Sequence, residues 1–256
     1  MIPIYIPTRG TVTKTYDNLP DSIKKSVIMF TDNIVDSIPL DQQLLFKGGI
    51  ANKRQACIDH AIKTNNEHMV LVDDDALLYK VIRNEDGTHK AAKELADEES
   101  YKSFYVDAIQ RFVDDDALTI ISDHSRAFIN GKNETNSNLN KFCIHDLAKV
   151  KKSGCVYNRI TIFEDIDFYL QLFRAGYSVR RTKIISSIND SSDYVDMSPD
   201  KYTAVFLDWQ EHFHHNVKIT WDTASIFAGN KRVPVTVNIK WKPMVYETVD
   251  LNNFFE

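Results

Sequence analysis

Two identical stretches, VDDDAL at residues 72–77 and again at 113–118, each place three carboxylates in a row. Neighbouring carboxylates repel one another and raise each other's pKa unless a cation compensates them. Carboxylate oxygens are also common ligands of Mg²⁺ and Mn²⁺, which complete their coordination shells with water and substrate phosphate. Each run could therefore hold a divalent cation. Because the letters are the same, only the elements that precede the runs can tell them apart.

The first run follows HMVLV, residues 68–72, an apolar segment that predicts a buried strand. In an open α/β sheet, ligands bind at the carboxyl ends of the strands. Alternate residues of an extended chain share a face, so Asp73 and Asp75 can point to one side while Asp74 points away. No basic residue stands beside them in the sequence to neutralise them. We expect a cation site here, and the alternative is a solvated surface turn.

The second run follows a segment with apolar residues at spacings of three and four, residues 101–113, which predicts an amphipathic helix. Carboxylates at the end of a helix face the negative end of its dipole and are tolerated when they are solvated. We therefore predict that residues 114–116 form a polar loop at the opposite edge of the sheet from the site.

A second group of acids, Glu164, Asp165 and Asp167, lies where a helix is predicted to begin after a strand. Acids in a first turn stabilise the helix dipole, which is the purely structural interpretation. The functional interpretation is that they converge on the first acid run from a second strand end.

Cations follow the first predicted strand and open a later helix. Thr8 and Arg9 come after the first strand, and Lys53 and Arg54 follow a Gly48–Gly49 pair. A helix N-terminus with nearby cations suits a diphosphate, although a solvated helix face is the alternative. Neither GxxxxGK[ST] nor GxGxxG is present, so neither a P-loop nor a dinucleotide fingerprint is supported.

Other polar side chains are candidates for binding an acceptor or a metal. Ser122, His124 and Arg126 follow a predicted strand and could meet an acceptor at the same edge, whereas a hydrolase triad is not supported. Three histidines in residues 212–215 lie on the polar face of an apolar stripe, which does not favour a metal-binding role for them. They are His212, His214 and His215.

The composition excludes some broad classes. The net charge of -5 gives no overall positive field of the kind that a protein simply coating DNA requires. Three cysteines, without metal-ligand spacing, indicate a reduced cytoplasmic setting rather than a disulfide framework. No apolar run approaches the roughly 18 residues of a membrane span, and residues 1–10 do not resemble a signal peptide. We expect a cytoplasmic protein that binds no membrane.

Strand and helix patterns alternate through the first half of the chain, which indicates an open α/β sheet. A segment with a turn at Asp86 and Gly87 interrupts this alternation and is predicted to project from the sheet. Residues 130–140 predict a loop. With no internal repeat and no clear linker, we predict a single domain. Strands are predicted at 2–7, 26–32, 68–72, 117–122, 141–148, 156–163, 178–188 and 234–241, and helices at 50–65, 101–113, 165–175 and 200–213.

Taken together, the opening strand, the acids after a central strand and the later ED pair resemble the GT-A fold of nucleotide-sugar glycosyltransferases. More narrowly, IPIYIPTRG, GGIANKRQACIDHA, VLVDDDALL and FEDIDFYLQLFRAGY resemble the bacteriophage TET-associated glycosyltransferases, which attach sugars to hydroxymethylated pyrimidines in DNA. The match covers most of residues 1–185 in motif order. It weakens after 186, where SSINDSSDYVD departs from the Gly- and Cys-rich segment of that family and leaves the acceptor side open.

The resemblance implies a single GT-A-like α/β domain over residues 1–256, with an open, mostly parallel but mixed sheet flanked by helices. Residues 1–125 would form a Rossmann-like half that binds the nucleotide sugar, and residues 126–256 would bind the acceptor. If the chain is viral, its compartment would be the host cytoplasm.

The resemblance also assigns roles by position. Asp73 and Asp75 would be the DxD pair that holds Mn²⁺ or Mg²⁺ against the donor diphosphate, with Asp74 beside the donor. The donor is expected to be a UDP-sugar. The remaining residues of the nucleotide pocket would be Pro7, Thr8, Arg9 and Arg54.

In the ED motif, Asp165 would be the base that deprotonates the acceptor hydroxymethyl group in an inverting enzyme. A retaining enzyme would use the carboxylates differently. Glu164 and Asp167 would position the acceptor or the base.

A base in DNA would have to flip out of the stack to reach such a site. Contacts to the DNA phosphates would come from local basic clusters, for which a solvated face is the alternative. These clusters contain Lys149, Lys151, Lys152, Arg180, Arg181 and Lys183.

Two other functions stay open at this point. The same fold could act on a glycan, a lipid or a protein instead of 5-hydroxymethylcytosine or 5-hydroxymethyluracil in DNA. A binding module that has lost catalysis is the third possibility, and the intact DDD and ED runs argue against it.

Overall fold

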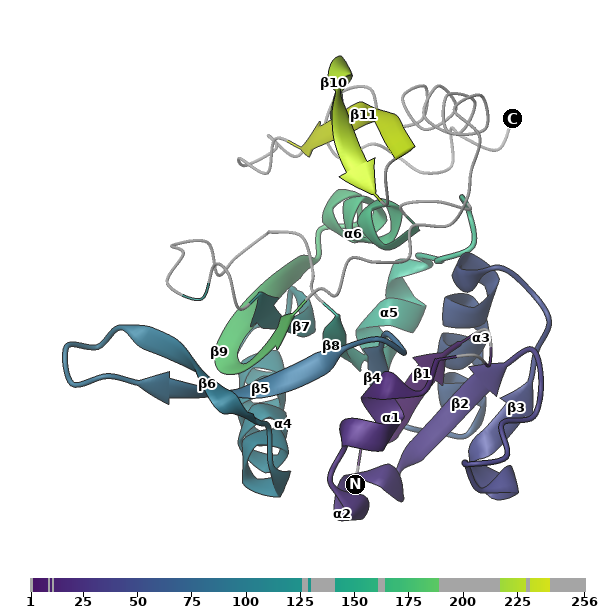
Figure 1. Cartoon of the computed structure of the whole chain (residues 1–256), viewed down its shortest axis with the longest axis vertical. Coiled ribbons are helices and arrows are strands. Elements are labelled where there is room, and N and C mark those ends of the chain that lie inside the picture. The colour runs from purple at the N-terminus through teal and green to yellow at the C-terminus, as the bar shows by residue number, and fades with distance from the viewer. Residues whose placement is uncertain are drawn as a thin grey trace.

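Apolar strands and amphipathic helices build a nine-stranded sheet with helices on both faces (Figure 1). The computed structural model describes residues 2–8, 10, 12–125, 129, 141–160 and 164–188, and the backbone of two further strands. In chain order, the elements are β1 (Ile4–Pro7), α1 (Lys14–Asn18), α2 (Asp21–Lys24), β2 (Val27–Thr31), the 3-10 turn η1 (Leu40–Gln42), β3 (Gln43–Leu45), α3 (Ile50–Lys63), β4 (His68–Val72), β5 (Leu77–Arg83), β6 (His89–Leu95), α4 (Glu98–Asp114), β7 (Leu118–Ser125), β8 (Phe142–Asp146), α5 (Leu147–Ser153), α6 (Glu164–Arg174), β9 (Ser178–Ile188), β10 (Val217–Ala228) and β11 (Lys231–Ile239).

The strand order is β3-β2-β1-β4-β8-β7-β9-β5-β6, and β10 pairs with β11 in a separate antiparallel sheet. Strands β3, β2, β1 and β4 are parallel neighbours, which gives the Rossmann-like half of the prediction. Among the described strands of the large sheet, parallel and antiparallel pairings are equal in number. The predicted α/β fold with an open, mixed sheet flanked by helices is confirmed.

The two aspartate runs lie at opposite edges of this sheet. Strands β4 and β7 both run antiparallel to β8, which lies between them, so they point the same way. Residues 73–75 follow the end of β4, at what we call the carboxyl edge, whereas residues 114–116 precede the start of β7 at the far edge. The predicted separation of the two runs is therefore confirmed.

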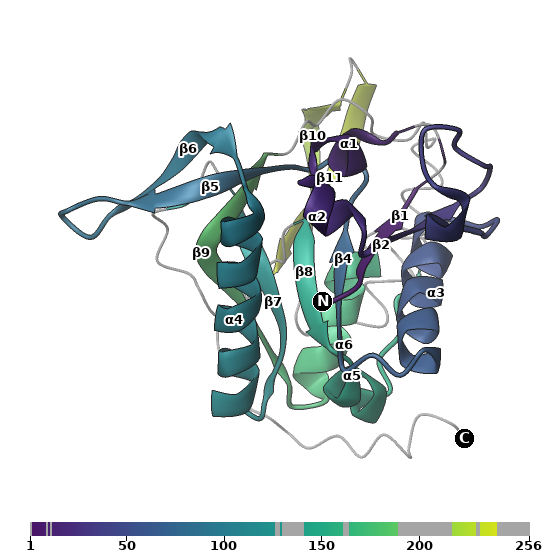
Figure 2. The ribbon, with the colours of Figure 1, turned by 90° about the horizontal axis from the view of Figure 1, so that it is seen from below.

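Alternate strand residues fill two hydrophobic cores, one on each face of the sheet. Tyr5 packs with residues of α3, α5 and α6 on one face. Its neighbours Ile4 and Ile6 pack with residues of α1, α2 and α4 on the other. Figure 2 shows the long α4 running beside the sheet. Because both faces are covered, a ligand has access mainly at the edges.

Some predictions about the second half of the chain were wrong. A strand was predicted at 156–163, but residues 156–160 form an irregular turn, and residues 161–163 lie outside the described part. The apolar character there serves packing, since the Tyr157 ring stacks on Phe168 with centroids 4.0 Å apart. Helix α5 was not predicted; Asp146 caps it by accepting a hydrogen bond from the Lys149 backbone N–H.

The predicted excursion is the β5–β6 hairpin, which projects from the sheet (Figure 1). Its turn contains Gly87 at φ +80, a conformation that residues with a Cβ rarely adopt. The strand predicted at 234–241 overlaps β11, whereas β10 was not predicted. The loop predicted at 130–140 and the helix predicted at 200–213 lie outside the described residues.

Cys57, Cys143 and Cys155 are buried free thiols, in agreement with the expectation of no disulfide framework. Within the described ranges, no helix combines the length and the apolar character that crossing a bilayer would require.

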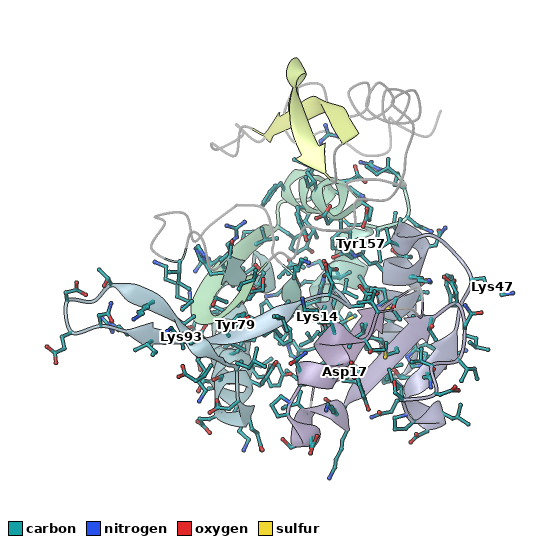
Figure 3. All side chains as sticks on the ribbon, viewed as in Figure 1. Lys14, Asp17, Lys47, Tyr79, Lys93 and Tyr157 are labelled. Atoms are coloured by element: carbon teal, nitrogen blue, oxygen red, sulfur yellow. The ribbon has the colours of Figure 1, made fainter. Side chains whose placement is uncertain are left out.

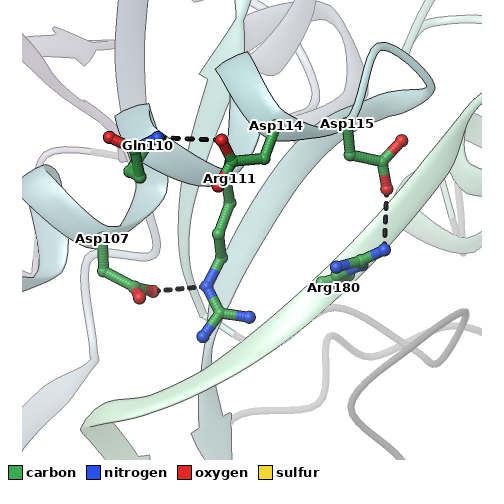
Figure 4. A pocket seen from close by; sticks show the side chains of 6 residues that line it. All are labelled: Asp107, Gln110, Arg111, Asp114, Asp115 and Arg180. Atoms are coloured by element: carbon green, nitrogen blue, oxygen red, sulfur yellow. Dashed lines mark hydrogen bonds and ion pairs between the residues drawn. The ribbon is translucent and has the colours of Figure 1, made fainter.

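At the far edge, the connection between α4 and β7 is held by Lys149 and Arg180, two of the cations predicted to contact DNA. Lys149 Nζ donates to the carbonyl oxygens of Phe112, Asp115 and Leu118 at 2.9, 3.2 and 3.0 Å. Arg180 pairs with the Asp115 carboxylate at 2.7 Å, beside an open hollow (Figure 4). Lys149 and Arg180 thus have structural partners, and their contacts to DNA stay a prediction. Asp115 is ion-paired rather than simply solvated.

The three hydrogen bonds of Lys149 predict a structural role. Replacing Lys149 with Met leaves these carbonyls without their donor, so we expect the free energy of unfolding to fall by about 1–3 kcal/mol. Urea unfolding measures the loss. The exposed Lys152 is the matched control, and its replacement by Met should change stability by no more than about 0.5 kcal/mol. Equal stability of the two variants would contradict this assignment.

Candidate active site

The first aspartate run forms a turn that two separate segments hold at the carboxyl edge. The buried Thr15 of α1 donates its backbone N–H to the Asp74 carbonyl at 2.9 Å. Its hydroxyl donates to the carbonyl oxygens of Asp73 and Ala76 at 2.5 and 3.0 Å. On the other side, the Asp73 N–H donates to the Lys141 carbonyl at 3.2 Å. The carboxylates therefore project from a fixed backbone.

Arg54 of α3 joins this turn to the ED pair. Its Nη2 donates to Asp73 Oδ1 at 2.6 Å, and its Nη1 donates to Glu164 Oε1 at 2.7 Å. Burial disfavours the charge on this guanidinium, yet Asp73, Glu164 and Asp165 together hold its pKa well above the usual range. The two acid groups identified in the sequence thus meet at one place, with a largely buried cation between them.

Lys141, the residue before β8, supplies the second cation. Its Nζ forms an ion pair with Asp75 Oδ1. The Lys141 side chain is 14% exposed, and that of Asp75 is 36% exposed. No basic residue stands beside the run in the sequence, but Arg54 and Lys141 reach it from distant parts of the chain.

The third carboxylate, Asp74, has a different environment from its neighbours. Burial raises its pKa, and the charges of Asp73 and Asp75 raise it further. A hydrogen bond with the Thr8 side chain opposes that rise. Thr8 is itself buried directly after Pro7, the last residue of β1. Thr8, Pro7 and Asp74 therefore lie together; Arg9 lies outside the described residues.

Lys53, next to Arg54, is buried rather than solvated. Its Nζ donates to the Thr8 carbonyl at 2.7 Å and to Asp32 Oδ2 at 2.8 Å. Since Thr8 follows β1 and Asp32 follows β2, Lys53 fixes the ends of two neighbouring strands. The helical stripe gave no sign of this, because Lys53 and Arg54 look equally exposed in the sequence.

The three acids of α6 differ in what they contact. Asp167 is fully buried and accepts two hydrogen bonds from Arg159, at 3.0 and 2.5 Å, and one from Gln171 at 2.7 Å. Glu164 is buried against Arg54, and burial raises its pKa to about 7 although Arg54 lowers it. Asp165 is half-buried and has no hydrogen-bond or ion-pair partner within the part of the chain that the structure describes.

The candidate acceptor residues Ser122 and His124 lie near the carboxyl end of β7 and are both buried. The Ser122 hydroxyl donates to the Asp123 carbonyl at 3.0 Å, and His124 Nδ1 lies 3.1 Å from the Ser125 carbonyl. Their burial favours a positioning role. Arg126 and the histidines in 212–215 lie outside the described residues.

A divalent cation fits the chemistry of this cluster. The nearby carboxylates Asp73, Asp74, Asp75, Glu164 and Asp165 outnumber the cations Arg54 and Lys141. Arg54 contacts a single oxygen of Asp73, and Lys141 contacts a single oxygen of Asp75. Among the described residues, no three His, Cys, Asp or Glu side chains are arranged to hold a metal on their own. An ion held by Asp73 and Asp75 would therefore need further ligands from water and a phosphate.

Comparisons with known proteins agree with these motifs. A model of the family described as TET-Associated Glycosyltransferase matches residues 2–197. A search of curated proteins found no significant match.

Among solved structures, S. aureus TarS 1-349 is 15% identical with a TM-score of 0.48, over 80% of this chain and 62% of that one. TarS 1-349 in complex with UDP is 16% identical with a TM-score of 0.43, over 80% and 63%. A197 from STIV is 10% identical with a TM-score of 0.44, over 77% and 87%. The chain thus spans less than two thirds of these TarS chains, and the likeness is too distant to assign a ligand.

The position of Arg54 predicts a pH-dependent loss of stability when it is removed. With Met at position 54, Glu164 stays buried without its cation, so its pKa lies even further above that of the unfolded chain. A carboxyl whose pKa is raised by folding adds stability at low pH, and this contribution is lost as the pH rises through the raised value. We expect Arg54→Met to lower the free energy of unfolding by about 2 kcal/mol at about pH 5 and about 4 kcal/mol at about pH 9.

Urea unfolding at both pH values measures these losses. Adding Glu164→Gln to Arg54→Met removes the buried titrating group, so the extra loss at high pH should disappear. An equal loss at both pH values in the single variant would show that Glu164 does not depend on Arg54.

Proposed function

The chain belongs to the TET-associated glycosyltransferase family, and we propose that it moves a sugar from a nucleotide-sugar donor to the hydroxymethyl group of a modified pyrimidine in DNA. The observation that carries this proposal is the double contact of Arg54. It brings the DDD turn, a candidate donor site, against the ED pair, a candidate catalytic site. Donor and acceptor chemistry would then take place within reach of one another.

On the donor side, the charge balance supports a requirement for Mn²⁺ or Mg²⁺. A donor diphosphate would bring further negative charge to a cluster in which carboxylates already outnumber cations. A divalent cation on Asp73 and Asp75 would supply Lewis-acid stabilisation of the leaving nucleoside diphosphate. Pro7, Thr8 and Asp74 would form the adjoining wall of the nucleotide pocket, and we propose a UDP-sugar as the donor.

On the acceptor side, Asp165 is the acid best suited to act as a base. Glu164 and Asp167 are engaged by Arg54 and by Arg159, so their role is to position the start of α6. In an inverting reaction, the acceptor hydroxyl would lose its proton to Asp165 as its oxygen attacks C1 of the sugar. The bond from C1 to the diphosphate oxygen would break, and the electron pair would leave with the nucleoside diphosphate.

The proposal that the acceptor is DNA depends on the family and on the size of the group that must enter. A hydroxymethyl group on 5-hydroxymethylcytosine or 5-hydroxymethyluracil would reach Asp165 only if the base leaves the duplex stack. The decisive experiment incubates the protein with nucleotide sugars and hydroxymethylated DNA, and weighs the digested nucleosides by mass spectrometry. Transfer to a glycan, lipid or protein, with none to modified DNA, would show that the acceptor is not DNA, although the glycosyl transfer reaction is the same.

The two aspartate runs provide a matched pair of variants for the donor side. We expect Asp75→Ala to reduce metal-dependent sugar transfer at least about a hundredfold, because it removes a charge that the cation needs. Asp116→Ala should leave transfer nearly unchanged, because Asp116 is exposed at the far edge. Initial rates at saturating Mn²⁺ measure both. Equal effects of the two substitutions would refute the assignment of the site to the first run.

A separate substitution tests the base. Asp165→Asn keeps the size of the side chain but removes the proton acceptor, so transfer should fall by about 10²–10⁴-fold. Nucleoside diphosphate binding, measured by calorimetry, should remain within about threefold of the unsubstituted protein. If Asp165→Asn transfers sugar at the normal rate while Glu164→Gln does not, the base is Glu164.

A further inference from the structure

Lys141 is a cation that the proposed reaction has not yet used. It is not part of either acid motif, and it reaches the site from the residue before β8. Its Nζ pairs with Asp75, one of the two carboxylates proposed to hold the divalent cation. A lysine ammonium and a divalent cation repel each other, so both cannot remain on the same carboxylate oxygen without cost.

The backbone of Lys141 is fixed beside the carboxylates. Its carbonyl accepts a hydrogen bond from the Asp73 N–H at 3.2 Å. The next residue, Phe142, is paired with Val72 in the sheet. An ammonium that leaves Asp75 therefore stays close to the turn, limited only by its own four-carbon stem.

Arg54 and Lys141 differ in their freedom to move. The Arg54 guanidinium is held by two carboxylates, one on each of its terminal nitrogens. The Lys141 ammonium has a single ion-pair partner among the described residues, on a carboxylate that is 36% exposed. A lysine is also a compact point charge on a flexible stem, whereas the planar fork of an arginine is pre-organised for two partners. Lys141 is the cation that can change partner.

We propose that Lys141 is an exchangeable donor-site cation, which neutralises Asp75 in the empty protein and binds a phosphate oxygen of the donor diphosphate when a divalent cation occupies Asp75. This inference depends on the proposed donor site but is independent of the acceptor. It gives Lys141 two successive anionic partners within one small region. It also explains why a cation is needed in addition to Arg54: without one, Asp75 would remain uncompensated in the empty protein.

The exchange predicts effects of opposite sign on two equilibria. In Lys141→Met, nothing competes with a divalent cation for Asp75, so Mn²⁺ should bind about tenfold more tightly in the absence of nucleotide. The same variant lacks a charge-assisted hydrogen bond to phosphate, so a nucleoside diphosphate should bind about tenfold more weakly in saturating Mn²⁺. A residue that only supports the fold would weaken both equilibria.

Calorimetric titration of the full chain measures both constants. The nucleotide probe is the one that the unsubstituted protein binds most tightly among UDP, GDP, CDP, ADP and dTDP. Lys141→Arg keeps the charge. Its dissociation constants for Mn²⁺ and for the nucleotide should be closer to those of the unsubstituted protein than the constants of Lys141→Met are. The control is Lys93→Met, an exposed lysine on the β5–β6 hairpin (Figure 3), and it should change neither constant.

The outcomes separate this inference from the proposed function. If the unsubstituted protein binds neither Mn²⁺ nor any of the nucleotides, the proposed donor site fails and the role of Lys141 fails with it. If it binds both, but Lys141→Met weakens Mn²⁺ binding or leaves nucleotide binding unchanged, only the exchange is overturned. Circular dichroism of Lys141→Met distinguishes a folded variant from an unfolded one. If the Met variant does not fold, Lys141→Gln, which also removes the charge, replaces it in both titrations.

Discussion

The geometry of the site depends on one largely buried guanidinium between two carboxylates. Arg54 extends from α3 to Asp73 after β4 and to Glu164 at the start of α6. A buried cation is tolerated only when such partners compensate it, so these three elements must keep their relative positions. The surrounding bonds serve that requirement: Thr15 fixes the aspartate turn, Lys53 fixes the ends of β1 and β2, and Asp167 anchors the first turn of α6.

The strand order of the sheet explains why the two aspartate runs, which are identical in sequence, have different partners. Because β8 lies antiparallel between β4 and β7, the residue that precedes β8 lies beside the end of β4. Lys141 therefore reaches Asp75 at the carboxyl edge. The residues at the start of β7 lie at the other edge, where Arg180 and Lys149 hold the second run in a structural connection. Topology, rather than local composition, decides at which edge of the sheet each acid run lies.

Sequence patterns predicted the elements and the edges well, because strand and helix periodicities are local properties. They placed Asp73 at the end of a central strand and Glu164 at a helix start, and both lie there. They could not predict that Arg54 joins the two, since Arg54 and Glu164 are 110 residues apart and nothing local marks the pair. The missed helix α5 has a related cause. It is only 7 residues long, and such a short helix depends on packing more than on propensity.

The three acids at the start of α6 cannot be told apart from their local sequence alone. The helix dipole favours all three acids of the first turn alike, yet their partners set them apart. Asp167 has two donors that hold it in the core, and Glu164 shares its buried cation with Asp73. A group held in this way cannot approach a substrate without breaking bonds that support the site. We propose Asp165 as the residue that accepts a proton, because Glu164 and Asp167 already hold the first turn of α6 in place. The proposed division of roles among three similar residues follows from the contacts that two of them make with the rest of the fold.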